Sequence, residues 1–163
     1  MMGEWQLLFS TNLLGSGFSR RLRLREMVQK IETNGFNGTL INMATWDFAE
    51  GDDDDNDDFT FNINGNFNIK CSYTITQGSR MVVDVNDLEV RPASGSSIPK
   101  DVPNLVGTLH RVIPNELFDP NGHAMDTTYI DTDIRIIRFT GPNHEGVRNI
   151  FMRKGALEIS SPM

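Results

Sequence analysis

Apolar and polar side chains alternate without interruption between Phe59 and Ile75. Every odd position in this stretch is aromatic, aliphatic, cysteine or glycine, and every even position is threonine, asparagine, serine or lysine. Because successive side chains of a strand point to opposite faces, the alternation predicts a strand with one buried face. Such a strand is about 56 Å long. Gly65 is therefore expected either to turn a hairpin together with Asn64 or to bend one curved strand, and the unbroken alternation favours the bend.

Shorter alternating stretches predict further strands along the rest of the chain. They cover residues 4–10, 21–31, 39–48, 81–90, 105–112, 127–139 and 147–153. Asn34 and Gly35 are typical of a two-residue turn between the second and third of these strands. The stretch 127–139 is expected to be either one strand or two shorter strands that fold at residues 131–133.

Loops separate these strands. Residues 91–104 are rich in proline and serine, and residues 140–146 read as a hairpin loop. No helix of normal length is predicted, apart from one helical turn near residues 115–118. Eight to ten antiparallel strands in a chain of 163 residues predict an all-β fold, a single antiparallel β-barrel domain over residues 1–163. Closure into a barrel removes the exposed strand edges.

The net charge of −7 is concentrated in one place. Six aspartates lie between residues 52 and 58, and without them the acids outnumber the bases by only one. We expect residues 50–58 to form a disordered acidic loop. An EF-hand that starts at Asp53 needs glycine sixth and glutamate twelfth, but Asp58 and Asn64 stand there, so no metal site is expected. No basic stripe suggests nucleic-acid binding.

Cysteine usage and hydropathy limit where the chain can work. A single cysteine excludes an internal disulfide and fits a reducing compartment. No stretch approaches the roughly 18 apolar residues of a transmembrane helix. No targeting segment precedes Gly3, so we expect either a cytoplasmic protein or a mature or truncated chain.

Sequence signatures of catalysis are missing. There is neither a Gly-x-Ser-x-Gly nucleophile motif nor a phosphate-binding glycine loop, and the three histidines have no metal-ligand spacing. Cys71 is one of the odd, apolar positions of the alternating stretch, so we expect it to be a buried and unreactive thiol. We therefore expect a non-catalytic protein without a cofactor. A small barrel isomerase or cyclase stays open as an alternative, with Tyr129, Asp131 and Asp133 as acid–base groups.

Two features near the N-terminus each have two interpretations. Trp5, in Gly3-Glu4-Trp5, is either an ordinary core residue or a plug at one end of the barrel, with an arginine of a late strand stacked on its indole. Arginines are concentrated at positions 20, 21, 23 and 25, and in a strand the odd-numbered ones form one cationic row. That row either pairs with acidic neighbours or touches anionic membrane lipids.

A second polar group lies in the stretch 128–138. In an unbroken strand, Arg135 shares its parity with Tyr129, Asp131 and Asp133, so the four side chains form one polar ladder. The ladder is either a set of cross-strand ion pairs on the solvent face or a site where an arginine holds the polar head of an apolar ligand.

Three of these segments resemble one protein family. Gly3-Glu4-Trp5-Gln6-Leu7-Leu8-Phe9-Ser10 resembles Gly-x-Trp-x-Leu-Leu-Tyr-Ser, which opens the plastid lipid-associated proteins, or plastid fibrillins. Residues 29–31 are similar to that family's Gln-x-Ile, and residues 128–138 to its Thr-Tyr-Leu-Asp-Glu-Asp-Leu-Arg-Ile-x-Arg. Residues 149–151 fall where its Phe-Val-Leu strand is expected. Phe139 replaces the family's glycine, and the acidic residues 50–58 have no counterpart in it.

The resemblance implies a lipocalin-like barrel in the plastid, associated with thylakoids or plastoglobules. It implies binding of a carotenoid, quinone, fatty acid or other prenyl lipid. The residues expected around such a ligand are Phe59, Phe61, Phe67 and Tyr73 as lining, and Trp5, Tyr129, Arg135 and Arg138 as polar or aromatic contacts. The alternative is a structural coat protein of a lipid droplet or membrane, with a barrel filled by its own side chains.

Overall fold

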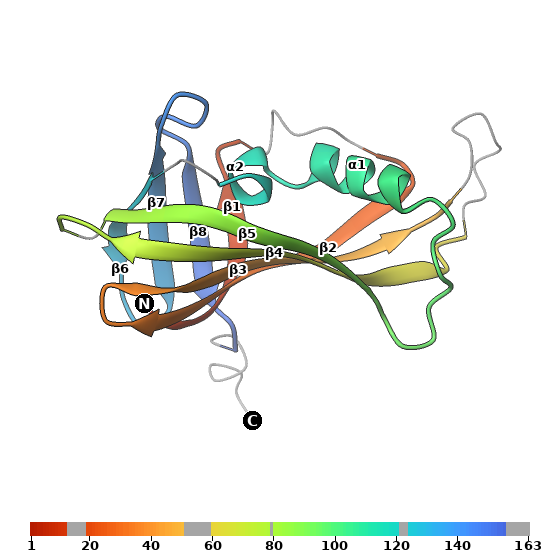
Figure 1. Ribbon diagram of the computed structural model, residues 1–163, viewed down its shortest axis with the longest axis horizontal. Coiled ribbons are helices and arrows are strands. Elements are labelled where there is room, and N and C mark those ends of the chain that lie inside the picture. Colours follow the sequence, from red (N-terminus) through yellow and green to blue (C-terminus); the bar gives the residue numbers. More distant parts are fainter. Residues whose placement is uncertain (13–18, 51–59, 79, 121–123, 156–163) are drawn as a thin grey trace, which may run out of the picture.

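The computed structural model describes residues 1–12, 19–50, 60–78, 80–120 and 124–155. Within these residues, eight strands pair in chain order and the last pairs with the first, which closes an antiparallel barrel (Figure 1). The strands are β1 (Gly3–Ser10), β2 (Leu22–Asn34), β3 (Asn37–Phe48), β4 (Ile63–Ile75), β5 (Arg80–Pro92), β6 (Ala124–Ile130), β7 (Ile134–Thr140) and β8 (Arg148–Arg153). The prediction of a single antiparallel barrel is confirmed. The acidic residues 51–58 lie outside the described part of the chain.

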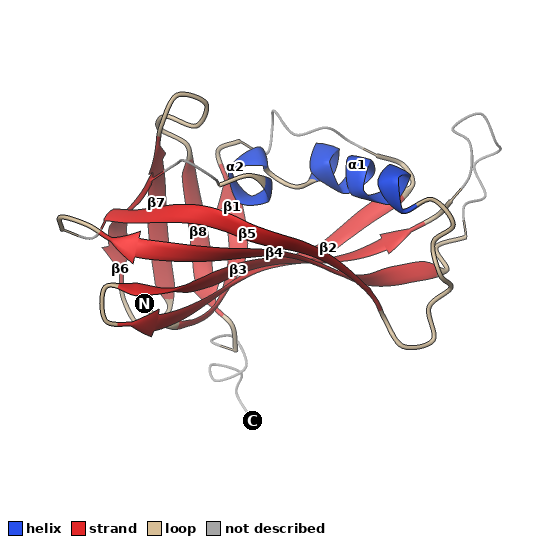
Figure 2. Cartoon of the chain, in the orientation of Figure 1, coloured by secondary structure: helices blue, strands red, loops and turns tan. Residues whose placement is uncertain are grey.

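Strand lengths divide the barrel into two parts. The strands β2, β3, β4 and β5 are long, whereas β1, β6, β7 and β8 are short. The long strands therefore extend beyond the short ones, and Figure 2 shows two helices on one side of this extension. These are α1 (Val102–Val112) and α2 (Asn115–Phe118).

Strand β4 confirms the alternation found in the sequence. Its odd positions from Ile63 to Tyr73 are buried, and Gly65 pairs with Trp46 on one side and Pro92 on the other. The glycine therefore lies within the strand, and the hairpin alternative at this position is wrong. A Cβ at Gly65 would lie 2.1 Å from the carbonyl oxygen of Arg91. Glycine is thus required here because the backbone of β5 approaches too closely for a side chain.

Helix α1 corrects the prediction of a strand at 105–112. Apolar residues recur there at positions 102, 105, 106, 109, 112 and 113, which is helical spacing. Asp101 caps the helix by accepting a hydrogen bond from the backbone nitrogen of Asn104 (3.1 Å). Leu105 and Leu109 are buried against the barrel core. No helix in the described part of the chain has the length and apolar character needed to cross a membrane.

Turns fall close to their predicted places. The β2–β3 turn consists of Gly35 and Phe36, one residue later than predicted, and Gly35 takes the positive φ that such a turn needs. The stretch 127–139 is two strands, β6 and β7, joined by residues 131–133. The helical turn expected near 115–118 is α2, and the 140–146 loop connects β7 to β8.

Candidate functional site

The barrel interior is mainly apolar, and one group of buried polar side chains in it is centred on an arginine. The largest fully buried residues include Trp5, Trp46, Phe67, Phe139 and Phe151. Among them lies Arg135 of β7, whose strand alternates so that Arg135, Ile137 and Phe139 are buried. Arg135 has a relative exposure of 0%, so its whole guanidinium is enclosed by the protein.

Hydrogen bonds connect Arg135 to the helices through two amide side chains. Nη1 of Arg135 donates to Oε1 of Gln29 on β2. Nε2 of Gln29 donates to Oδ1 of Asn42 on β3 (3.0 Å), and Nδ2 of Asn42 donates to the carbonyl oxygen of Leu117 on α2 (2.9 Å). All four residues are buried. Gln29 and Asn42 lie opposite each other in the β2–β3 register, so strand pairing alone brings the amides together.

Arg135 carries a charge that no described carboxylate neutralises. Its Nε and Nη2 are buried and have no hydrogen-bond partner among the described residues. Burial in this apolar surrounding lowers the pKa of Arg135 to about 10, and nearby Tyr73 acts in the opposite direction. The guanidinium carbon also lies 5.7 Å from the centre of the Phe151 ring. Uncompensated buried charges are costly and are concentrated at functional sites.

The polar ladder expected from residues 129 to 135 is wrong. The chain turns at 131–133, and the β6–β7 pairing has a register shift between Thr127 and Tyr129. The side chains of Tyr129 and Arg135 therefore do not share one face of a continuous strand. Tyr129 is exposed, and its hydroxyl donates to Asp131 (2.6 Å). This hydrogen bond and those from the backbone of Ile134 and Asp133 lower the pKa of Asp131. Asp131 thus stabilises the turn on the outside of the barrel.

Arg138 is also separated from Arg135. It follows Arg135 by three positions in β7 and therefore lies on the outer face, where it contacts Glu145 (3.5 Å). Of the four predicted polar or aromatic contacts, Trp5 and Arg135 face the interior, and Tyr129 and Arg138 do not. The three expected acid–base groups Tyr129, Asp131 and Asp133 are likewise exposed at the turn.

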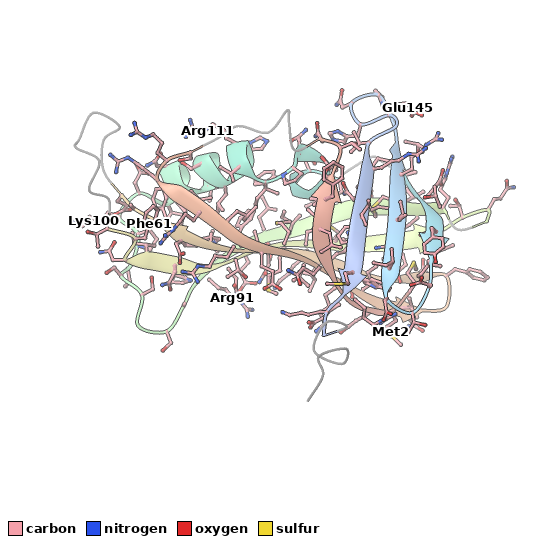
Figure 3. All side chains as sticks on the ribbon, turned by 180° about the vertical axis from the view of Figure 1, so that it is seen from behind. Met2, Phe61, Arg91, Lys100, Arg111 and Glu145 are labelled. Atoms are coloured by element: carbon pink, nitrogen blue, oxygen red, sulfur yellow. The ribbon has the colours of Figure 1, made fainter. Side chains whose placement is uncertain are left out.

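Of the four predicted lining residues, two lie inside the barrel, one lies outside it, and one is not described. Phe67 and Tyr73 are buried inside the barrel, with Phe67 stacked on Phe118 of α2 (5.6 Å). The hydroxyl of Tyr73 donates to the carbonyl oxygen of Glu32 (3.0 Å). Phe61 precedes β4 and packs under the guanidinium of Arg23 (3.9 Å), at the end of the molecule opposite to Met2 (Figure 3). Phe59 lies outside the described residues.

Trp5 lies in the core and also has the stacked arginine of the second interpretation, at one end of the barrel. Its indole is fully buried, and the guanidinium carbon of Arg153, at the end of the last strand, lies 4.3 Å from the centre of the ring. Nε1 of Trp5 donates to the carbonyl oxygen of Met1 (2.8 Å). Gly3 has a φ of 132°, and a Cβ there would lie 2.6 Å from Arg153. The Gly-x-Trp spacing therefore makes room for the arginine above the indole.

A buried carboxylate that the sequence did not reveal holds α2 on the barrel. Glu116 is fully buried and accepts hydrogen bonds from the hydroxyl of Ser10 and from Nδ2 of Asn12 (2.8 Å). With its amide oriented to donate, Asn149 reaches Ser10 Oγ (2.9 Å) and Glu116 Oε1 (3.0 Å). These residues are far apart in the sequence and form no motif, so only the fold identifies them.

The arginines near the start of β2 pair with acid rather than form a free cationic row. Arg25 and Arg23 (3.6 Å) both contact Asp47, whose side chain is almost fully buried. Arg21 is buried, and its Nη1 lies 3.5 Å from the carbonyl oxygen of Ala49. A surface cleft of about 530 Å³ lies between Arg23, Arg25 and Asp47 and the end of α1 at Val112. Within the described ranges, no group of three or more histidine, cysteine or acidic residues is placed to hold a metal ion.

These observations define a class of protein, namely a closed eight-stranded antiparallel barrel with a desolvated, uncompensated arginine in its interior. Comparisons with protein-family models, with curated proteins and with solved structures give no match.

Proposed function

We propose that the barrel binds one hydrophobic small molecule without transforming it and carries that molecule at a lipid surface of the plastid, such as a thylakoid or plastoglobule. The observation that carries this proposal is Arg135, which has two unpartnered donors in a mainly apolar interior. Barrels of eight strands are wide enough to hold one small ligand. The plastid setting rests on the resemblance of residues 3–10 and 128–138 to plastid fibrillins.

The energetics favour an apolar ligand with a small polar part. Burying apolar surface contributes about 25 cal/mol per Å². The interior supplies aromatic and aliphatic side chains for such contacts, together with one polar group that Arg135, Gln29 and Asn42 build. A ligand that matches this pattern has a long hydrocarbon portion and a single polar head.

Native mass spectrometry of the protein isolated from its own organism tests the proposal. We expect one stoichiometric ligand that organic extraction releases and that has the mass of a prenyl lipid, carotenoid, quinone or fatty acid. The same protein, once delipidated, is expected to take up a fluorescent lipid at one site per chain. An empty protein that also fails to bind any lipid in titration would contradict the carrier function.

A second candidate function, a structural coat on a lipid droplet or membrane, is favoured by a different observation. Four large apolar side chains are exposed at the end of the barrel that Trp5 closes, namely Met2, Phe36, Tyr129 and Ile130. Arg153 connects the parts of this end, since it donates to the carbonyl oxygens of Met2 (3.2 Å) and Thr132 (2.8 Å). Exposed apolar residues grouped in this way mark contact surfaces.

We expect Phe36→Asp to weaken binding to phosphatidylcholine vesicles about tenfold, because Phe36 is 75% exposed at a hairpin tip and a charge there opposes insertion. Vesicle flotation measures the bound fraction. Ile98→Asp is the matched control, because Ile98 is 81% exposed in the loop between β5 and α1. Equal binding by the two variants would remove the basis for contact through this end.

A further inference from the structure

We propose that the ligand of the barrel bears a carboxylate and that Arg135 binds it directly. This inference rests on the proposed carrier function and narrows it, because the neutral carotenoids, quinones and prenyl alcohols are then poor ligands. It follows from the charge of the interior, from the geometry of the free donors and from the number of cations present.

Among the buried charged side chains of the described core, Arg135 is the one with polar atoms left without hydrogen-bond partners. Buried Glu116 accepts hydrogen bonds from Ser10 and Asn12, and buried Asp47 contacts two arginines. Arg135 instead donates to the neutral amide of Gln29 and contacts no described carboxylate. A ligand that brings a negative charge to this position removes an electrostatic cost that a neutral ligand leaves in place.

The two unpartnered nitrogens of Arg135 lie on the same edge of the guanidinium. Nη1 is occupied by Gln29, whereas Nε and Nη2 are free. Together, Nε–H and Nη2–H form a planar fork whose spacing matches the two oxygens of a carboxylate. Neither nitrogen is exposed to solvent, so neighbouring side chains must move aside for the ligand, and the resulting hydrogen bonds are then shielded from water.

The number of cations favours a single negative charge. In the described interior, Arg135 is accompanied by the neutral Gln29 and Asn42 and by no second buried arginine or lysine within their hydrogen-bonded group. One guanidinium neutralises one carboxylate, whereas a phosphate group with two charges calls for more cations. The apolar residues around Arg135 supply contacts for a hydrocarbon chain. A long-chain carboxylic acid fits both features.

Palmitate and 1-hexadecanol provide a matched test, since they have chains of the same length and differ in the head group. Each displaces a neutral fluorescent probe from the delipidated full chain at pH 8. We expect palmitate to bind at least about tenfold more tightly than hexadecanol, as charge-assisted hydrogen bonds predict. In Arg135→Met this preference is expected to disappear while hexadecanol still binds. Arg153→Met, which removes the arginine above Trp5, is the control and is expected to keep the preference.

The outcomes separate the two proposals. Equal affinity of the wild-type protein for palmitate and hexadecanol overturns the carboxylate proposal and leaves the carrier function standing. Displacement of the probe by neither compound overturns the carboxylate proposal alone, whereas failure of the probe and of both compounds to bind overturns both proposals. A preference that survives in Arg135→Met overturns the role of Arg135. If that variant does not fold, carbon-13 NMR of carboxyl-labelled palmitate on the wild-type protein decides, because contact with the guanidinium lowers the pKa of the bound carboxyl. An unchanged or raised pKa overturns the proposal.

Discussion

Replacing Arg135 by methionine is expected to raise the free energy of unfolding of the ligand-free protein by about 1–4 kcal/mol. The guanidinium is fully buried, and two of its three nitrogens have no partner among the described residues. Methionine removes the desolvated charge and keeps the apolar stem of the side chain, but it ends short of the guanidinium carbon that lies over Phe151, so a small gap offsets part of the gain. The substitution leaves Oε1 of Gln29 without its donor, which costs about 1–3 kcal/mol and sets the lower part of the expected range.

The pH dependence of this gain has a defined sign. Burial lowers the pKa of Arg135 to about 10, below its ordinary value of 12.5. Between these two values, the unfolded chain binds more protons than the folded protein, so the folded protein gains stability as the pH rises through 10. The difference in the free energy of unfolding between Arg135→Met and the wild-type protein is therefore expected to be largest below pH 10 and to decrease above it.

Urea unfolding at pH 8 and at pH 10.5 measures both effects. Arg153→Met is the control, because it removes a cation–π contact of about 0.5–1 kcal/mol and is expected to destabilise the protein. A destabilised Arg135→Met protein would contradict the prediction, since the contacts of Arg135 with Gln29 and Phe151 would then outweigh its desolvation. If Arg135→Met is more stable but no longer prefers the carboxylate ligand, Arg135 lowers stability in exchange for function, as functional residues commonly do.

The parts of the fold that the sequence predicts are those governed by local alternation. The alternation in β4 predicts that Phe67, Cys71 and Tyr73 face the interior, and all three are buried. A strand with one buried face requires this pattern. The turn at 131–133 also has a local signal in its aspartates. In contrast, the segment 105–112 is short and contains three β-branched residues, so its sequence also fits a strand, and only the packing of Leu105 and Leu109 on the barrel selects the helix.

The candidate site was less accessible because it depends on contacts between distant strands. Arg135 and Arg138 are both arginines flanked by apolar residues. Which of them faces the interior depends on where β7 begins after the turn. Gln29 and Asn42 come together through the β2–β3 register, and Leu117 reaches them through the placement of α2. None of these contacts leaves a motif in the sequence. The exception is Gly3-Glu4-Trp5, for which a stacked arginine is one of the two interpretations that the sequence offers.

The thiol of Cys71 is expected to react with iodoacetamide at pH 8 about a thousandfold more slowly in the folded protein than in the chain unfolded by guanidinium chloride. Burial in β4, followed by the nearby charge of Asp84, raises the pKa of Cys71 from 9.0 to about 12. Since the thiolate is the reactive form, the raised pKa removes most of it at pH 8. The chain has one cysteine, so the labelling rate reports on this position alone.

Because the folded thiol keeps its proton between pH 9 and pH 12 and the unfolded thiol loses it, this group opposes folding as the pH rises above 9.

The matched control for the labelling experiment is Ser72→Cys in a Cys71→Ser background. Position 72 points to the opposite face of β4 and is expected to react at an ordinary rate. Labelling of folded Cys71 within tenfold of the unfolded rate would show that the barrel interior is hydrated, and the desolvation assigned to Arg135 would then be too large. If labelling proceeds through opening of the barrel, saturating palmitate must slow it further, because a ligand bound only to the closed barrel lowers the population of the open form.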